Sequence, residues 1–327
     1  MKVLLAGATG ALGVPLVRRL QAAGHEVTGL TRSEAGAGAL WDLGASSVRA
    51  DALDRDGLLR ALDGHRADAV IHQLTALKKM PMRSRDLELT NRLRVEGTAN
   101  LLAAAQLVGA RRFVTQSFLG GYGFCDGSRE LTEQDRFAPP GGGRFDAVWR
   151  ALRSTEQQVL EARDIDGIVL RYGCFYGPAS IGVMLDGLRK RRFPVPRGGG
   201  SCLSFIYLDD AASATVAALD RSQPNQIYNI VDEEPVRWGV LVDALAEAFS
   251  LPRPLRVPGA VLRAVAPYAG TMMTRQSLRL SNAKAKAELG WRPTVPTYRE
   301  GVAALVSALI KPEDVDDAVE AGGTVRK

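Results

Sequence analysis

Cysteine and histidine are scarce in this sequence, which has three of each among its 327 residues. Cys125, Cys174 and Cys202 form no CxxC pair, so we expect neither a disulfide framework nor a zinc site, and we assign no metal. Without a disulfide pattern, the reducing cytoplasm is the expected compartment.

Long apolar runs and clusters of basic charge are also absent. No apolar run approaches the roughly 18–20 residues of a membrane helix, so we expect no membrane partner. The net charge is +6, but the arginines are spread along the chain and no basic run is interleaved with aromatic residues. Nucleic acid is therefore not an expected partner. The excess charge indicates either a solvated surface or a field that attracts an anionic cofactor or substrate.

What the first half does contain is a regular alternation of apolar strands and amphipathic helices. Such alternation with short loops predicts a parallel sheet that is covered on both faces. The expected fold is α/β, with a doubly wound parallel Rossmann sheet. The predicted strands are 2–6, 26–31, 47–50, 69–73, 112–117 and 167–172, and the predicted helices are 14–23, 35–43, 55–62, 87–109 and 148–162.

After Tyr172 the pattern loosens, and glycine and proline become frequent. We expect residues 1–172 and about 203–230 to form the dinucleotide-binding domain. We expect a smaller C-terminal domain, formed by residues 173–202 (approximate bounds) and 231–310, to cap the substrate. Residues 311–327 are polar and are predicted to form a frayed tail.

A glycine-rich loop joins the first predicted strand to the first predicted helix. In such a loop Gly7 permits the tight turn, Gly10 lets the backbone approach a pyrophosphate, and Gly13 lets the helix pack on the strand. The helix N-terminus then offers N–H groups to the phosphate. The alternative is an ordinary strand–helix turn. The predicted phosphate-binding residues are Gly7, Thr9, Gly10, Ala11, Leu12 and Gly13.

The end of the second strand lacks the acidic residue that usually binds the adenosine ribose of NAD. Arg32 and Ser33 stand there instead, and a guanidinium binds a 2′-phosphate in a fork geometry. NADP(H) is therefore the expected cofactor, with NAD(H) as the alternative. Arg32 could otherwise be a solvated side chain at a strand end.

Several motifs, in order, cover residues 1 to about 299. They are the Gly7–Gly13 loop, Asp51-Ala52-Leu53-Asp54, His72–Ala76, Asn91 with Gly97-Thr98, Asn100-Leu101-Leu102, Ser117, Arg171–Pro178, Leu208-Asp209-Asp210, Tyr228-Asn229-Ile230 and Ser281–Trp291. Together they resemble the short-chain dehydrogenase/reductase superfamily, in the extended and atypical branches that include sugar-nucleotide epimerases. The resemblance implies that Asp51 meets the adenine amino group, although Asp51 could be a simple turn acid. It further implies cofactor contacts from Ala52, Leu74, Thr75, Ala76, Tyr172 and Gly173.

The chain departs from the family at its catalytic pair. The family uses a serine at the end of the fifth strand and a Tyr-x-x-x-Lys on the next helix. Ser117 matches the serine, but alignment on Glu156 places Val148 and Leu152 at the tyrosine and lysine positions. A shift by one residue places Trp149 and Arg153 there, and neither pair can exchange a proton.

The candidate proton donors are therefore Ser117 and Tyr122, which lies on the loop after the fifth strand. Tyr122 and His72 could both be structural instead. Lys78 and Lys79 lie on a loop that the fold would place near the substrate mouth.

We expect an NADPH-dependent reductase of a carbonyl, imine or conjugated double bond in a small metabolite. A substrate that is already cationic or acidic would need no Tyr-Lys pair. The alternatives are a non-redox dehydratase, isomerase or cyclase on the same scaffold, and a catalytically silent NADP sensor. The resemblance also suggests a homodimer through helices 87–109 and 148–162.

Overall fold

A computed structural model describes residues 1–310 apart from 78, 140, 142 and 144. The predicted tail 311–327 and Lys78 therefore lie outside the described residues. The central feature is a seven-stranded parallel sheet in the order β12-β7-β5-β4-β1-β2-β3. Its strands are β1 (Lys2–Ala6), β2 (Glu26–Thr31), β3 (Ser46–Arg49), β4 (Ala69–His72), β5 (Arg112–Phe118), β7 (Asp166–Tyr172) and β12 (Gln226–Ile230). This sheet confirms the predicted α/β Rossmann fold.

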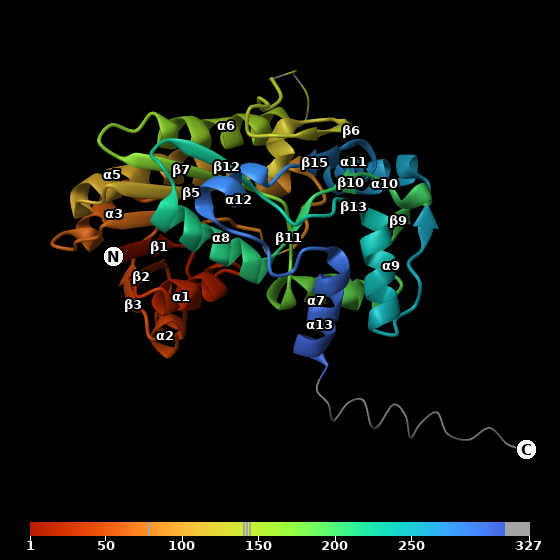
Figure 1. Ribbon diagram of the computed structural model, residues 1–327, viewed down its shortest axis with the longest axis horizontal. Helices are drawn as coiled ribbons and strands as arrows, with labels where there is room; N and C mark the ends of the chain where they lie inside the picture. The colour runs from red at the N-terminus through yellow and green to blue at the C-terminus, as the bar shows by residue number, and fades with distance from the viewer. Residues whose placement is uncertain (78, 140, 142, 144, 311–327) are drawn as a thin grey trace, which may run out of the picture.

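Helices cover both faces of this sheet (Figure 1). One apolar cluster joins it to α1 (Gly13–Ala22), α2 (Glu34–Asp42), α8 (Leu208–Arg221) and α12 (Ala283–Leu289). A second cluster joins it to α3 (Arg55–Leu62), α5 (Thr98–Val108) and α6 (Asp146–Leu160). Because the strands are buried on both faces, β4 is apolar except for His72 and entirely buried.

The predicted helix 87–109 is helical from Glu88 to Val108, but its hydrogen-bond pattern changes in the middle. It consists of α4 (Glu88–Arg92), a π-helical turn over Leu93–Gly97 and then α5. The Thr155 hydroxyl of α6 donates to the backbone carbonyl of Arg94 in this turn, at 2.7 Å. Such turns inside helices occur often at functional sites. The helices α5 and α6 pack against each other, and the homodimer through them stays a prediction.

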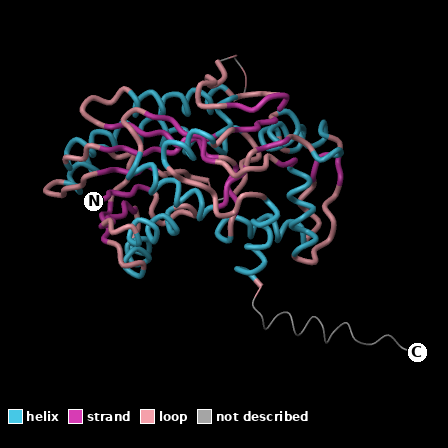
Figure 2. Tube along the Cα trace, viewed as in Figure 1, coloured by secondary structure: helices cyan, strands magenta, loops and turns pink. Residues whose placement is uncertain are grey.

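A smaller set of elements lies at the end of the molecule away from the N-terminus (Figure 1). Figure 2 shows short strands joined by long loops there, in contrast to the central sheet. A third apolar cluster holds this part together. The strands are β6 (Asp126–Leu131), β8 (Cys174–Tyr176), β9 (Val195–Pro196), β10 (Cys202–Leu203), β11 (Phe205–Tyr207), β13 (Val236–Arg237), β14 (Arg256–Val257) and β15 (Ser277–Leu280). The helices are α7 (Pro178–Arg189), α9 (Trp238–Ala248), α10 (Gly259–Val265), α11 (Pro267–Arg275) and α13 (Tyr298–Leu309).

No helix among the described residues is long and apolar enough to cross a membrane. Short 3-10 turns at Ser84–Leu87, Leu119–Tyr122 and Arg197–Gly199 complete the described elements.

Candidate active site

A cavity of about 1330 Å³ lies between the carboxyl ends of the sheet strands and the smaller part of the molecule. We call its two ends the cofactor half and the substrate half. The cofactor half is lined by the glycine loop and the residues after β2, β3 and β4. The substrate half is lined by the end of β5, β8, α7, α11 and the start of α9. Ligands of doubly wound sheets bind at this edge.

Most of the predicted cofactor residues meet at this cavity. The lining includes Gly7, Thr9, Gly10, Ala11, Leu12, Gly13, Arg32, Ser33, Asp51, Ala52, Leu74, Thr75 and Ala76. Tyr172 and Gly173 are not part of the lining. The Tyr172 side chain is fully buried, and its hydroxyl lies 2.7 Å from the Thr215 hydroxyl. The structure thus does not bring these two residues to the predicted cofactor site.

The glycine loop has the shape that a pyrophosphate requires. Gly7 has a φ of +95°, and a Cβ there would lie 2.7 Å from the Gln73 carbonyl oxygen. A Cβ on Gly13 would lie 2.1 Å from the Gly7 carbonyl oxygen, so the helix packs on the loop only because Gly13 has no side chain. Gly10 borders the cavity, and a Cβ there would lie 3.2 Å from the Gly7 oxygen. The residues present therefore fit a dinucleotide.

Arg32 and Ser33 lie at the outer end of the cofactor half. The Ser33 oxygen accepts the Gly36 N–H at 3.1 Å and caps α2, which leaves its O–H free to donate. The Arg32 guanidinium lies 3.9 Å from the Asp51 carboxylate, and both side chains are well exposed. Such an exposed pair contributes little stability, so a phosphate can replace Asp51 as the partner of Arg32 at low cost.

Ser117 borders the cavity, but its hydroxyl is engaged behind the cavity wall. It donates to the Glu156 carboxylate at 2.6 Å. The register of β5 and β7 pairs Ser117 with Arg171, whose guanidinium donates two hydrogen bonds to Glu156, at 2.9 and 2.7 Å. Burial disfavours the charged Arg171, yet the contacts with Glu156 outweigh it and raise the Arg171 pKa. Ser117 therefore belongs to a buried ion-pair network.

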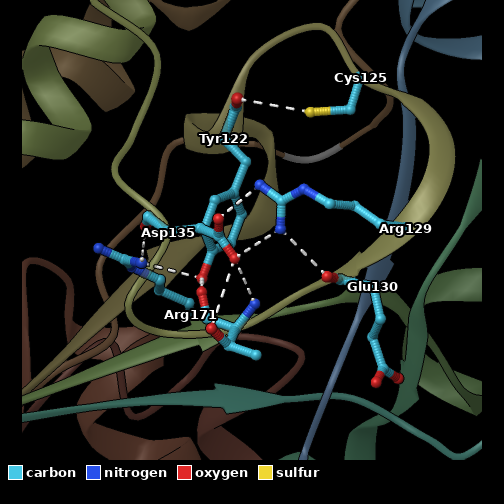
Figure 3. A network of polar contacts seen from close by, with 7 residues as sticks. Tyr122, Cys125, Arg129, Glu130, Asp135 and Arg171 are labelled. Carbon is cyan, nitrogen blue, oxygen red and sulfur yellow. Dashed lines mark hydrogen bonds and ion pairs between the residues drawn. The ribbon is translucent and has the colours of Figure 1, made fainter.

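Tyr122 belongs to the same network (Figure 3). Its hydroxyl accepts from Arg171 at 2.9 Å and donates to the Asn229 side-chain oxygen at 2.8 Å. Burial raises the Tyr122 pKa to about 12. Tyr122 is absent from the residues that line the cavity within the described chain. This placement argues against Tyr122 as the proton donor to a bound substrate.

Figure 3 also shows how the loop before α6 is fastened to this network. Asp135 forms an ion pair with Arg129 at 2.6 Å, and its backbone carbonyl accepts from Arg171 at 3.3 Å. The hydrogen bonds from Arg129 and Thr132 lower the Asp135 pKa to about 2. These contacts hold Tyr122 and its surroundings in place and serve structure.

The helix α6 does not reach the cavity in the described part of the chain. Val148 and Leu152, which stand at the positions of the family's catalytic pair, are 3% and 0% exposed. Trp149 packs among Phe124 and Phe145 instead of bordering the cavity. The face that would carry the tyrosine and lysine is thus part of an apolar core.

His72 at the end of β4 has a structural environment. Burial lowers the His72 pKa to about 4, so the ring is neutral near pH 7. Its Nδ1 accepts the backbone N–H of Leu74 at 3.2 Å. This contact fixes the chain direction after β4, where Leu74, Thr75 and Ala76 border the cavity.

The substrate half contains residues that the sequence motifs did not indicate. Phe118, Arg94 and Tyr268 all border it. They come from β5, the π-helical turn and α11, which are far apart in the sequence. Lys79 borders the cavity as well, and its place near the substrate mouth was predicted. No sequence motif marks the other three, because only the tertiary fold brings them together.

Comparisons with known proteins agree with this geometry. The model of the NAD dependent epimerase/dehydratase family matches residues 3–231, so the chain belongs to this family. A 3-diazoavenalumate denitrifying reductase from Streptomyces is 36% identical over 92% of this chain and 99% of its own length. A 4-hydroxy-2-methyl-3-oxo-4-farnesyl-3,4-dihydroquinoline-1-oxide ketoreductase from Stigmatella aurantiaca is 27% identical over 94% of this chain and 96% of its own.

Solved structures show the same fold. The UDP-glucose 4-epimerase of Thermotoga maritima has a TM-score of 0.76 and 22% identity, and it covers 98% of this chain and 100% of its own. The human epimerase family protein SDR39U1, solved with NADPH, has a TM-score of 0.76 and 20% identity over 94% of this chain and 100% of its own. Family membership and the reductase names of its relatives define an NAD(P)-dependent oxidoreductase of the short-chain dehydrogenase/reductase type.

Proposed function

We propose that the protein is an NADPH-dependent reductase whose acceptor takes up hydride and needs no proton from the protein. The observation that carries this proposal is that the described cavity lining contains no free proton donor at the positions of the family's catalytic residues. Val148 and Leu152 are buried aliphatic residues away from the cavity, and the Ser117 hydroxyl is bound to Glu156. An acceptor that becomes an alkoxide would depend on a positioned proton donor for about 10²–10⁴ in rate.

The cofactor preference rests on Arg32 and Ser33. A bound nicotinamide dinucleotide phosphate would supply hydride in this cavity. Gly7 to Gly13 would hold its pyrophosphate at the N-terminus of α1, as backbone N–H groups and the helix dipole favour anions there. Arg32 would pair with the 2′-phosphate instead of with Asp51.

The acceptor that fits best is an aromatic diazonium. The relative named as a denitrifying reductase of a diazo compound supports this class. Replacement of the diazonium by hydride gives the arene, dinitrogen and oxidised cofactor, so that no proton enters the balance. An electrophile that already carries positive charge thus explains why the tyrosine and lysine are dispensable.

The experiment follows deuterium from NADPH into the product. The purified protein is mixed with 4-carboxybenzenediazonium and NADPH deuterated at either face of C4, and the benzoate formed is analysed by mass spectrometry. We expect enzyme-dependent incorporation of one deuterium from one face, with release of dinitrogen. Reactions without enzyme, and with a Gly10→Val variant, measure the background.

A matched panel of an aryl ketone, an imine and an enone tests the competing reactions that the ketoreductase relative suggests. Faster single-turnover reduction of the ketone than of the diazonium would overturn the proposed acceptor and leave the reductase assignment standing. Absence of any enzyme-dependent deuterium transfer would favour the non-redox or sensor alternatives.

A further inference from the structure

Arg94 is a buried cation in the wall of the substrate half. The residue is only 8% exposed, and it borders the cavity. It lies on the π-helical turn between α4 and α5, where its backbone carbonyl is held by the Thr155 hydroxyl. Arginine is rarely buried without a paired acid, so this position calls for a physical explanation.

Within the described chain, Arg94 has no acidic partner within 4 Å. Its Nη1 donates a hydrogen bond to the Asn91 side-chain oxygen, at 3.3 Å. The nearby acid Glu96 is bound to Arg92 on the surface. Among the described residues, the Nε and Nη2 groups of Arg94 have no hydrogen-bond partner, and the residue borders the cavity. Two donor groups of a fixed fork are thus available to a ligand.

The guanidinium stays charged despite its burial. Desolvation lowers the Arg94 pKa to about 10, which leaves it protonated at neutral pH. A desolvated charge without a counterion is costly, and an incoming anion removes that cost. The site therefore favours an anionic ligand over a neutral one of the same shape.

Tyr268 from α11 provides a second donor in the wall of the substrate half. Both Tyr268 and Arg94 border the cavity there. Burial raises the Tyr268 pKa to about 12, so its hydroxyl is neutral and can donate. Its ring stacks on Phe145 with a centroid distance of 5.0 Å, which holds the plane of the ring in place.

Apart from Lys79 at the mouth and small polar residues such as Ser180, the rest of the substrate half is apolar and aromatic. Phe118, Phe205, Trp238 and Met272 line it, and such a surface suits a planar aromatic body. Among the described lining residues the acid is Asp51, which lies beside Arg32 in the cofactor half. The charge of this half therefore attracts an anion.

We infer that Arg94 and the Tyr268 hydroxyl form a carboxylate-binding subsite, which orients a planar aromatic acid in the substrate half. The inference rests on the proposed function for the statement that this acid is the hydride acceptor. The binding of the acid itself depends only on the cavity. With the carboxylate on Arg94, the opposite end of the aromatic body is left for reduction.

The test is direct binding of benzoate, trans-cinnamate and 2-naphthoate, each against its neutral primary amide, by titration calorimetry in the presence of NADP⁺. We expect the protein to prefer at least one acid over its amide by about 10–150-fold, the range of one charge-assisted contact. Arg94→Gln should remove this preference, and Tyr268→Phe should reduce it by about 3–10-fold. Arg94→Lys should keep part of it, since the charge remains without the fork.

Arg92→Gln is the matched control, because it removes one positive charge that lies two residues from Arg94 and belongs to an exposed ion pair with Glu96. It should leave the acid preference unchanged. Thermal unfolding of Arg94→Gln separates binding from structure: a subsite arginine can be removed with an unchanged or raised Tm, since an unpaired buried charge disappears.

Two results would overturn the inference: equal binding of acids and amides, or no measurable binding of all three acids to the unchanged protein. An acid preference that depends on Arg94 in a protein that transfers no hydride would support the subsite and reject the proposed function. Hydride transfer to a diazonium without any acid preference would support the proposed function and reject the subsite.

Discussion

The two halves of the cavity are built in different ways. In the cofactor half, the wall consists of one short glycine loop and of the residues at the ends of neighbouring strands of one sheet. In the substrate half, side chains from β5, β8, α7 and α11 and from the π-helical turn meet across large separations in the sequence. The first half is a local structure, and the second is a product of tertiary packing.

This difference indicates where the specificity of the protein resides. A phosphate is recognised by backbone N–H groups, so its site needs a fixed geometry and tolerates few side chains. A substrate is distinguished by a small number of polar side chains in an apolar wall, such as Arg94. Substitutions in the cofactor half should therefore affect nucleotide binding, whereas substitutions in the substrate half should affect the choice of substrate.

The largest effect is expected from Gly10→Val. Among the described residues beyond its chain neighbours, a Cβ at Gly10 would meet the Gly7 oxygen at 3.2 Å and no other atom within 4 Å, so the side chain enters the space that the pyrophosphate needs. NADPH affinity should fall by more than about 100-fold, which corresponds to the loss of two charge-assisted contacts. Fluorescence titration measures the affinity, and an unchanged Tm shows that the variant is folded.

Gly13→Ala provides the contrast for this prediction. A Cβ there would lie 2.1 Å from the Gly7 oxygen, so this variant should lose stability, whereas Gly10→Val should lose binding. Retained NADPH affinity in a folded Gly10→Val protein would mean that the loop is only a turn.

A smaller effect is expected from Arg32→Ala at the outer end of the cofactor half. Its guanidinium contacts Asp51 only at 3.9 Å, so stability should hardly change. NADPH affinity should fall by about 10–150-fold and NADH affinity should stay the same, because only the 2′-phosphate differs. Titration with both nucleotides measures the ratio. Equal affinities in the unchanged protein would contradict the proposed preference for NADPH.

The sequence predicts the cofactor half well because this half is a local structure. Gly7, Gly10 and Gly13 are local requirements of one turn, and their spacing can be recognised without any tertiary contact. The parallel sheet is likewise marked by apolar strands that alternate with helices. The π-helical turn was missed because no residue type marks an insertion of this kind inside a helical pattern.

The substrate half could not be predicted in this way. The pairing of Ser117 with Arg171 depends on the register of two strands that are 54 positions apart in the sequence, and the position of Glu156 on α6 completes it. Tyr122 follows β5 directly, which favoured a place beside the substrate. The 3-10 turn after β5 instead directs its hydroxyl to Asn229 and Arg171.

The smallest effect on chemistry is expected from Tyr122→Phe and Ser117→Ala. If the acceptor needs hydride alone, each variant should keep the single-turnover rate of hydride transfer within about 3-fold, whereas loss of a positioned acid costs about 10²–10⁴. Stability should respond instead. Tyr122→Phe removes a hydroxyl that bridges Arg171 and Asn229, which should lower the free energy of unfolding by about 1–3 kcal/mol. Urea unfolding and stopped-flow kinetics on the same variants measure the two quantities. A 100-fold slower hydride transfer in Ser117→Ala, with its stability retained, would place the proton donor at Ser117 and restore the carbonyl as the better acceptor.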